Sequence, residues 1–286
     1  MYLSFENELG KIEMSGGENG YNWRITAIEG LALPQKEFQQ VTYAGVDGQS
    51  TLSERLQPRT ITIGGDVQSS QGLQQELTRA TQIFHRKGWL KLQLGNKQRK
   101  IEGRCVSFEL NGRNGAAAPF VLQLICDQPH FGDFENTRVF VFQLIAGLNG
   151  SFTPSETVFS QRHTEANVRN RGDSSAEPVF MITNTKADID ADIDATITIK
   201  NQTNNQQFKF NYPSKKGETI TIDIPNRTMR NGAGESILHT ITDDTFLSDF
   251  WLEQGNNLVS VLPPSDSDQE ISAACIFNNP YIEAVV

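Results

Sequence analysis

Cysteine is scarce in this sequence. Its 286 residues include three cysteines, an odd number, and each lies far from the others within alternating apolar and polar residues. Small secreted proteins that are held together by disulfides use even numbers of cysteines in a compact framework. We therefore exclude that class and expect reduced thiols in the hydrophobic core at Cys105, Cys126 and Cys275.

Long apolar runs are missing as well. No stretch approaches the roughly 18 apolar residues that a membrane-spanning helix requires. The first eight residues contain neither the basic region nor the apolar region of a secretory signal. The sequence thus predicts synthesis in a cytosol and no membrane partner.

Positive charge is in short supply in the second half of the chain. Residues 1–130 contain 14 Lys and Arg against 13 Asp and Glu, whereas residues 131–286 contain 11 against 21. Proteins bind nucleic acid mainly by placing Lys and Arg on phosphates, so this half predicts no sequence-specific nucleic-acid partner. We expect the acidic half to stay soluble and exposed.

Motifs that carry catalysis are absent. The sequence has no Gly-x-Ser-x-Gly motif, no Walker loop and no G-x-G-x-x-G after a strand. The four histidines lie far apart and in no metal-ligand spacing. We expect no enzyme, no cofactor and no metal, although carboxylates from distant loops can also assemble an acid–base pair.

Two short motifs have a functional and a plainer interpretation. Residues 188–194 alternate Asp with apolar residues and resemble a calcium loop, but Ile193 stands where that loop needs Gly and Ile199 where it needs Glu. Period-2 alternation favours a strand with an acidic face instead. Arg171-Gly172-Asp173 matches a cell-adhesion tripeptide, and we interpret it as a turn between strands.

The length of the chain predicts two domains, at roughly 100–200 residues each. The best boundary lies at residues 128–133, where Pro129 removes a donor from any strand ladder and Gly132 permits a turn. We therefore predict one domain at residues 1–131 and a second at residues 132–286.

One amphipathic helix is predicted, over residues 73–87. We expect Ser69 or Ser70 to cap its N-terminus and Gly88 to end it in a left-handed conformation. The helix lies between strand-like segments and should pack on a sheet through one apolar face at helical spacing, which consists of Leu73, Leu77, Ala80 and Phe84.

The rest of the first half alternates as strands do. A hairpin is expected between residues 38–43 and 60–63, around a long polar loop in which Asp47-Gly48 favours a turn. Loops of this length are often functional. We predict a β-sandwich with one helix, whose further strands lie at residues 21–31, 90–94, 106–110 and 120–126.

The second half predicts an antiparallel β-sandwich. Its short segments of alternating character are separated by Gly, Asn and Pro clusters, and no strong helix lies between them. Residues 243–250 predict one short helical turn or loop. The strands are expected at residues 139–145, 179–183, 193–200, 207–212, 219–224, 258–262 and 271–277.

The order of these segments resembles the distal tail proteins of phages with long, non-contractile tails. The resemblance spans nearly the whole chain and is dense over residues 20–131. In the second half, residues 168–173 and Glu177-Pro178 look like the opening of that family's sandwich domain. In the first half it is carried by residues 21–31, Gly45-Val46-Asp47-Gly48, residues 59–65, the helix, residues 90–94, residues 99–106, residues 120–126 and Pro129-His130-Phe131.

The resemblance implies a structural virion protein at the tail tip, made in the cytoplasm of a bacterial host. Its N-terminal domain would assemble with copies of itself into a ring, with six expected. A galectin-like C-terminal sandwich would project outward. The ring would connect the tail tube to the tail tip or baseplate and its receptor-binding components. On this basis the expected subunit contacts are Val46, Asp47, Gly48, Leu52, Arg55 and Arg59.

A carbohydrate-binding adhesion module is the alternative function. Exposed aromatic side chains can stack on sugars, and a galectin-like fold makes host cell-wall glycans plausible ligands. Trp23, Trp89 and Trp251 all lie within apolar alternation and predict core packing, with Trp251 the best candidate for more. The expected contacts to a glycan or partner are Trp251, Phe250 and Tyr212.

Overall fold

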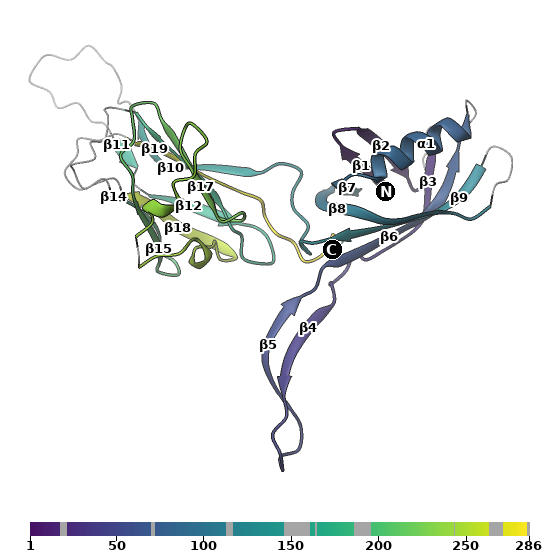
Figure 1. Ribbon diagram of the computed structural model, residues 1–286, viewed down its shortest axis with the longest axis horizontal. Coiled ribbons are helices and arrows are strands. Elements are labelled where there is room, and N and C mark those ends of the chain that lie inside the picture. Colours follow the sequence, from purple (N-terminus) through teal and green to yellow (C-terminus); the bar gives the residue numbers. More distant parts are fainter. Residues whose placement is uncertain are drawn as a thin grey trace, which may run out of the picture. The chain divides into compact units, whose positions relative to one another are not determined.

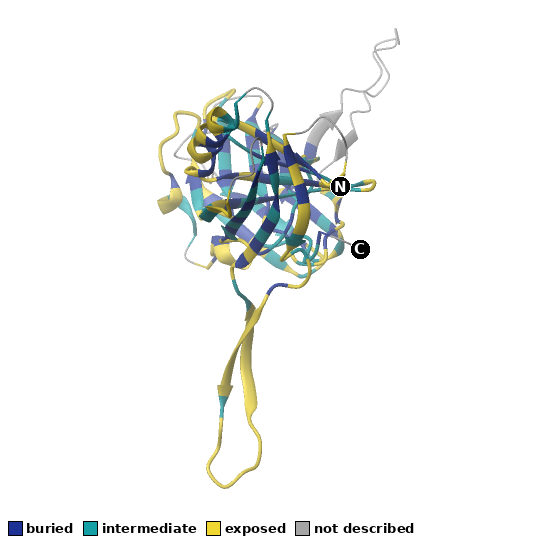
Figure 2. Cartoon of the chain, turned by 90° about the vertical axis from the view of Figure 1, so that its right-hand side faces the viewer, coloured by how far each residue is buried: buried dark blue, intermediate teal, exposed yellow. Residues whose placement is uncertain are grey.

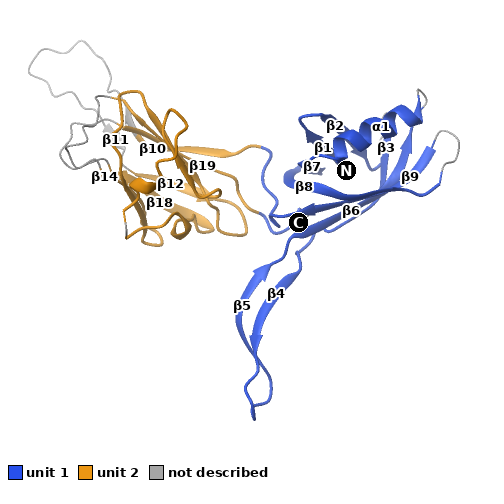
Figure 3. Ribbon diagram, viewed as in Figure 1, with its two compact units in different colours: residues 1–134, 281–286 blue, residues 135–280 orange. Residues whose placement is uncertain are grey.

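The computed structural model of the protein describes residues 1–17, 22–69, 72–112, 117–145, 161–163, 165–185, 196–242, 244–262 and 271–284. The chain forms two compact units (Figure 3). Unit 1 consists of residues 1–134 and 281–286, and unit 2 consists of residues 135–280. The sequence-based division after residue 131 assigned the last residues to the second domain, whereas they belong to unit 1.

The return of the chain to unit 1 rests on backbone hydrogen bonds. Phe131 and Tyr281 exchange two of them, at 2.8 and 2.7 Å, and the amide of Ala284 donates to the carbonyl oxygen of Leu31 at 3.0 Å. Unit 2 is therefore an insertion into unit 1, connected to it at both ends of residues 135–280.

Unit 1 is a closed seven-stranded barrel with one helix (Figure 1). The expected sandwich is corrected to a barrel because the first strand, β1, pairs with β2 on one side and with β7 on the other. The sequence-based prediction included neither β1 nor β2. In barrel order the strands are β1 (Tyr2–Asn7), β2 (Gly10–Ser15), β3 (Trp23–Glu29), β6 (Arg59–Gln68), β9 (Ala117–Cys126), β8 (Lys97–Leu110) and β7 (Gly88–Leu94).

The predicted helix is confirmed as α1 (Leu73–Phe84), although its ends differ from the expectation. Gly72 occupies the N-cap position without a side-chain cap, in place of Ser69 or Ser70. Gly88 lies in β7 and does not terminate the helix. A Cβ at Gly88 would meet the Phe5 ring at 2.8 Å and the carbonyl oxygen of Glu6 at 2.6 Å, so close packing explains this glycine.

The buried face of α1 packs against an aromatic cluster inside the barrel. The ring of Phe84 contacts those of Phe5 and Trp23, with centroids 5.5 and 6.0 Å apart. The indole N–H of Trp23 donates to Glu76 Oε1 at 2.7 Å, which satisfies the polar atom of an otherwise buried side chain. The helix is thus fixed to the barrel by apolar packing and by one buried donor.

A separate two-stranded hairpin stands away from the barrel of unit 1 (Figure 2). It consists of β4 (Lys36–Val41) and β5 (Ser50–Leu56), joined by residues 42–49. The sequence predicted residues 60–63 as the partner of β4, but those residues lie in β6 between β3 and β9. We call residues 36–56 the arm.

Unit 2 is an antiparallel sandwich of two sheets around its own core, as predicted. The predicted helical turn is also confirmed, as the 3₁₀ turn η2 (Leu247–Asp249). One sheet has the order β11 (Gln161–His163), β10 (Thr137–Ile145), β19 (Ile271–Phe277), β13 (Val179–Asn184), β16 (Thr219–Asp223) and β17 (Thr228–Arg230). The other has the order β12 (Glu165–Asn170), β18 (Gly255–Leu262), β14 (Thr196–Asn201) and β15 (Gln206–Asn211).

No helix among the described residues is both long and apolar enough to cross a membrane.

Candidate interaction surfaces

The arm brings together most of the residues that the sequence assigned to subunit contacts. Val46 and Leu52 are 65% and 63% exposed, and Asp47, Gly48 and Arg55 are exposed as well. Ion pairs join the two strands, between Arg55 and Glu37 at 2.7 Å and between Lys36 and Glu54 at 3.3 Å. The arm therefore presents apolar side chains beside two ion pairs.

The arm has almost no core of its own. Every residue of β4 and β5 is exposed except the half-buried Val41 and Leu56. An isolated two-stranded hairpin is marginally stable in water unless something packs on it. Its apolar residues also include Phe38, which is 48% exposed, and the following loop contains Tyr43 at 57%. The arm thus exposes apolar side chains that the other described residues leave uncovered.

Arg59 was also predicted as a subunit contact, and this prediction is wrong for the fold observed. The side chain is 2% exposed and lies at the base of the arm. Its guanidinium donates to the carbonyl oxygens of Pro129 at 2.8 Å and Gly30 at 2.6 Å, and also to those of Ala32 and Ile282. These partners come from three segments that are distant in the sequence, so Arg59 joins them and does not face outward.

The environment of Arg59 contains no carboxylate among its described partners. Its guanidinium carbon lies 4.5 Å from the centroid of the Phe131 ring, and burial lowers the pKa of Arg59 to about 10. Carbonyl dipoles and an aromatic face take the place of a counter-ion. The residue is therefore a structural junction.

The three aromatic residues proposed for glycan contact fall in different environments. Phe250 is fully buried and packs edge-on against Phe180, with ring centroids 5.3 Å apart, so it cannot contact a ligand. Tyr212 is half-buried, and its hydroxyl donates to Glu218 Oε1 at 3.0 Å. The indole N–H of half-buried Trp251 donates to Glu253 Oε1 at 2.7 Å. The structure does not bring these three side chains together on one exposed surface.

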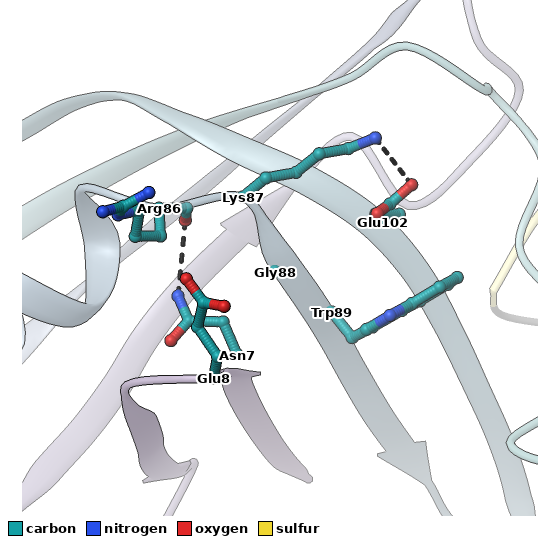
Figure 4. Close-up of a pocket in the computed structure, with 7 residues that line it drawn as sticks. All are labelled: Asn7, Glu8, Arg86, Lys87, Gly88, Trp89 and Glu102. Atoms are coloured by element: carbon teal, nitrogen blue, oxygen red, sulfur yellow. Dashed lines mark hydrogen bonds and ion pairs between the residues drawn. The ribbon is translucent and has the colours of Figure 1, made fainter.

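Trp89 is an exposed aromatic residue that sequence analysis assigned to the core. It is 40% exposed and lies beside a pocket of about 410 Å³ (Figure 4). Lys87 and Glu102 form an ion pair at 2.8 Å in that pocket, and Asn7 donates to the carbonyl oxygens of Ile83 and Arg86 at the end of α1. The sequence does contain a signal for this exposure, because Trp89 shares one face of its strand with the polar residues Lys91 and Gln93.

The predicted acidic motif at residues 188–194 lies outside the described residues. Within the described part of the chain, no group of three or more His, Cys, Asp or Glu is placed to hold a metal ion. Gly172 of the adhesion-like tripeptide packs tightly, since a Cβ there would lie 2.2 Å from the carbonyl oxygen of Pro280. The amide of Gly172 donates to Asn170 Oδ1 at 2.9 Å, as in an Asx-turn, and this hydrogen bond favours the turn interpretation.

The buried cysteines are expected to be unreactive. Burial raises the pKa of the Cys126 and Cys275 thiols, that of Cys126 to about 12. A thiol with such a pKa is ionised to about one part in 10⁴ at pH 8. We expect iodoacetamide to leave both residues unmodified in native protein and to alkylate them in guanidinium, as read by mass spectrometry of peptides. Rapid alkylation of native Cys126 would contradict this expectation.

Comparison with known proteins finds similarity in structure. No family model and no curated protein matches the sequence. Among solved structures, the chain is similar to the SPP1 Dit protein, described as a paradigm of the hub adsorption apparatus in phages that infect Gram-positive bacteria. The TM-score is 0.64 at 13% identity, and the similarity covers 90% of this chain and 92% of that chain.

Two structures of the phage P2 baseplate in its activated conformation, with Ca and with Sr, are similar as well. Each gives a TM-score of 0.53 at 12% identity and covers 96% of this chain and 97% of that chain. The chain thus has the fold of a phage distal tail hub protein over nearly its whole length. The predicted resemblance and the mainly β architecture are confirmed at the level of the fold.

Proposed function

We propose that the protein is a structural component of a phage virion, a distal tail hub that connects the tail tube to the tail tip or baseplate. The observation that carries this proposal is the shared fold with the SPP1 Dit protein across 90% of the chain. Fold similarity alone does not determine function. The arm supplies independent support, because a hairpin with almost no core exposes apolar side chains that a partner surface would bury.

In this proposal unit 1 assembles with copies of itself into a closed ring of six. Residues 1–130 are nearly balanced in charge, so that copies can approach without strong repulsion. A ring needs a contact in which two different surfaces of each copy meet. The arm of one copy would provide one of these surfaces, through Val46, Asp47, Gly48, Leu52 and Arg55.

Unit 2 would lie outside the ring and contact baseplate or receptor-binding components. Acidic residues predominate in the second half of the chain, so two copies of unit 2 repel each other unless a specific contact offsets that repulsion. Tail tube, tail tip and baseplate proteins are the proposed partners.

Imaging tests the ring directly. Purified protein, alone or mixed with its tail-tip partner, should sediment well above the mass of one chain, 31.9 kDa. Closed rings should be visible by electron microscopy. A protein that stays monomeric in both conditions would contradict the proposal.

Charged substitutions in the arm should prevent assembly without unfolding the chain. We expect Leu52→Asp combined with Val46→Asp to weaken self-association by roughly tenfold or more, because both apolar side chains would lose a partner surface. The melting temperature should be unchanged, since both residues are more than 60% exposed. Sedimentation velocity measures the association.

Phe246→Asp provides the control for the arm variant. Phe246 is an apolar residue of unit 2 that is 61% exposed, and it lies outside the arm. The control should assemble as wild type does. Equal loss of assembly in both variants would mean that the arm has no specific role.

A further inference from the structure

The outer face of the six-stranded sheet of unit 2 has an apolar centre. Strand register places residues of β10, β19, β13, β16 and β17 side by side in two rows across this face. Five neighbouring members are apolar: Phe140 is 49% exposed, Val179, Met181 and Ile276 are half-buried, and Ala274 is 3% exposed. The first row is Phe140, Ala274, Met181, Thr221 and Arg230, and the second row is Arg138, Ile276, Val179, Asp223 and Thr228.

The other sheet of the same sandwich shows what an outer face in contact with water looks like. Its outward positions are almost entirely polar, and the apolar exceptions, Leu258 and Leu262, both lie on β18. The polar positions are Glu165, Asn167, Arg169, Thr196, Thr198, Lys200, Gln207, Lys209, Asn211, Asn256 and Ser260. A contiguous apolar centre on one of two faces indicates an interaction surface.

Opposite charges lie at the two sides of the apolar centre. Arg138 stacks on Phe140, with its guanidinium carbon 5.1 Å from the ring centroid, and no carboxylate pairs with it in the described part of the chain. Asp223 lies on β16, on the far side of β19 and β13, and accepts two hydrogen bonds from Asn226. The second row therefore runs from a cation through two apolar residues to an anion.

This order of residues allows two copies of the sheet to pack face to face, with each end of the row in one copy opposite the other end of the row in the second copy. A two-fold axis that runs along the strands between β19 and β13 exchanges β10 with β16 and β19 with β13. Arg138 of one copy then faces Asp223 of the other, on both sides of the axis. Ile276 faces Val179, and the small Ala274 faces the larger Met181.

The same operation also pairs the ends of the first row. Phe140 comes to lie opposite Thr221 of the second copy, next to Arg230, whose guanidinium has no carboxylate partner in the described residues either. Two sheets that pack face to face interdigitate their side chains at a spacing of about 10 Å. The second row thus gains apolar contacts in the middle and an ion pair at each end, and the first row gains apolar contacts in the middle.

We propose that a second copy of this chain covers the outer face of the six-stranded sheet, through a two-fold contact between the two copies of unit 2. The contact involves Phe140, Met181, Ile276 and Val179 at its centre and Arg138 with Asp223 at its rim. It is separate from the ring proposed for unit 1, which uses the arm. Each interaction can therefore be removed while the other is kept.

The first test removes the apolar centre in the full-length chain. Phe140→Asp should raise the dissociation constant of the pair roughly tenfold or more, as measured by sedimentation equilibrium. Leu262→Asp is the matched control, because Leu262 is 45% exposed on the outer face of the opposite sheet. The control should pair as wild type does. To separate pairing from ring assembly, both substitutions are also made in the Leu52→Asp, Val46→Asp background.

The second test reverses the charges at the rim. Arg138→Asp and Asp223→Arg should each weaken the pair, and the double variant should restore it, because opposite charges again face each other between copies. Within one copy the two residues are three strand spacings apart, about 14 Å. That exceeds the screening length of about 8 Å at physiological salt, so restoration cannot come from contact within one copy.

The outcomes of these tests are separable. Suppose that the Leu52→Asp, Val46→Asp variant is monomeric and that Phe140→Asp changes self-association neither in that variant nor in the wild-type chain. The proposed pair would then not exist, whether or not the ring forms. Equal effects of Phe140→Asp and Leu262→Asp would also overturn the proposal. Because Asp223 stabilises a turn at Asn226, thermal melting must show that each variant is folded. Should Asp223→Arg fail to fold, Asp223→Asn replaces it, because asparagine keeps an oxygen acceptor for Asn226. Asp223→Asn should weaken the wild-type pair but strengthen the pair of the Arg138→Asp variant, since it removes the carboxylate that the new aspartate at position 138 would face.

Discussion

Replacing Arg59 with methionine is expected to destabilise unit 1 by about 4 kcal/mol, because buried carbonyl oxygens lose their donors. The guanidinium donates hydrogen bonds to the backbone carbonyl oxygens of four residues, Pro129, Gly30, Ala32 and Ile282. Each buried acceptor left without a donor costs about 1–3 kcal/mol. Part of the total cost is offset, because the variant no longer has to bury a charged guanidinium. Methionine fills much of the volume of the arginine side chain, so the loss of stability measures mainly the missing hydrogen-bond donors.

Calorimetry of the whole chain measures this effect. The transition of unit 1 should move down by roughly 10 °C, while that of unit 2 stays in place. Arg104→Met is the control, since Arg104 is exposed on β8 and its replacement should shift neither transition. If Arg59 acted as a subunit contact, the substitution would lower self-association and leave the transition of unit 1 unchanged.

The second large effect is expected at adjacent glycines of β6. A Cβ at Gly65 would lie 2.1 Å from the carbonyl oxygen of Arg24 and 3.0 Å from the Phe120 ring. At Gly64 the nearest atom is the Cβ of Ala27, at 3.8 Å. Gly65→Ala should therefore cost about 3 kcal/mol or more, whereas Gly64→Ala should stabilise slightly by restricting the unfolded chain.

Urea denaturation of the two alanine variants provides the comparison. The substitutions are chemically identical and one residue apart, so intrinsic strand propensity cancels between them. Near-equal midpoints would mean that β3 moves away from β6 at no cost, and would contradict the tight packing at the β3 bulge between Ile25 and Ala27.

Periodicity predicted the parts of the fold that have a buried side. Helix α1 was predicted because apolar residues recur on one face at helical spacing, and β9 because its residues are apolar on both faces, as in a central strand. Strands β1 and β2 carry the same signal, with Leu3 and Phe5 on one and Ile12 and Met14 on the other buried. They were missed, and with them the closure that makes unit 1 a barrel.

The arm could not be placed by the same reasoning. Neither β4 nor β5 buries one face, so their sequence contains no period that specifies a partner strand. Residues 60–63 looked like a suitable partner because they alternate strongly. That alternation instead reflects burial in the barrel, where Ile61 and Ile63 are fully buried.

Long-range contacts explain the candidate residues that were misplaced. Arg59 is a charged residue on a strand, which favours exposure unless distant carbonyls converge on it, and the sequence contains no sign of that convergence. Phe250 neighbours Trp251 in the sequence, but packing against Phe180 sends it into the core. The exposure of the arm residues has a local signal, a polar, Gly-containing loop, whereas their role as subunit contacts stays a prediction.

The insertion of unit 2 into unit 1 sets the order of events during translation. Ile282 accepts a hydrogen bond from Arg59, and Ala284 bonds to Leu31, yet both residues are made after the whole of unit 2. At about 5–20 residues per second, the roughly 150 residues in between delay them by about 10–30 s. The nascent first unit spends that interval with Arg59 short of one acceptor, so unit 1 can complete its hydrogen bonds only after the whole of unit 2 has been synthesised.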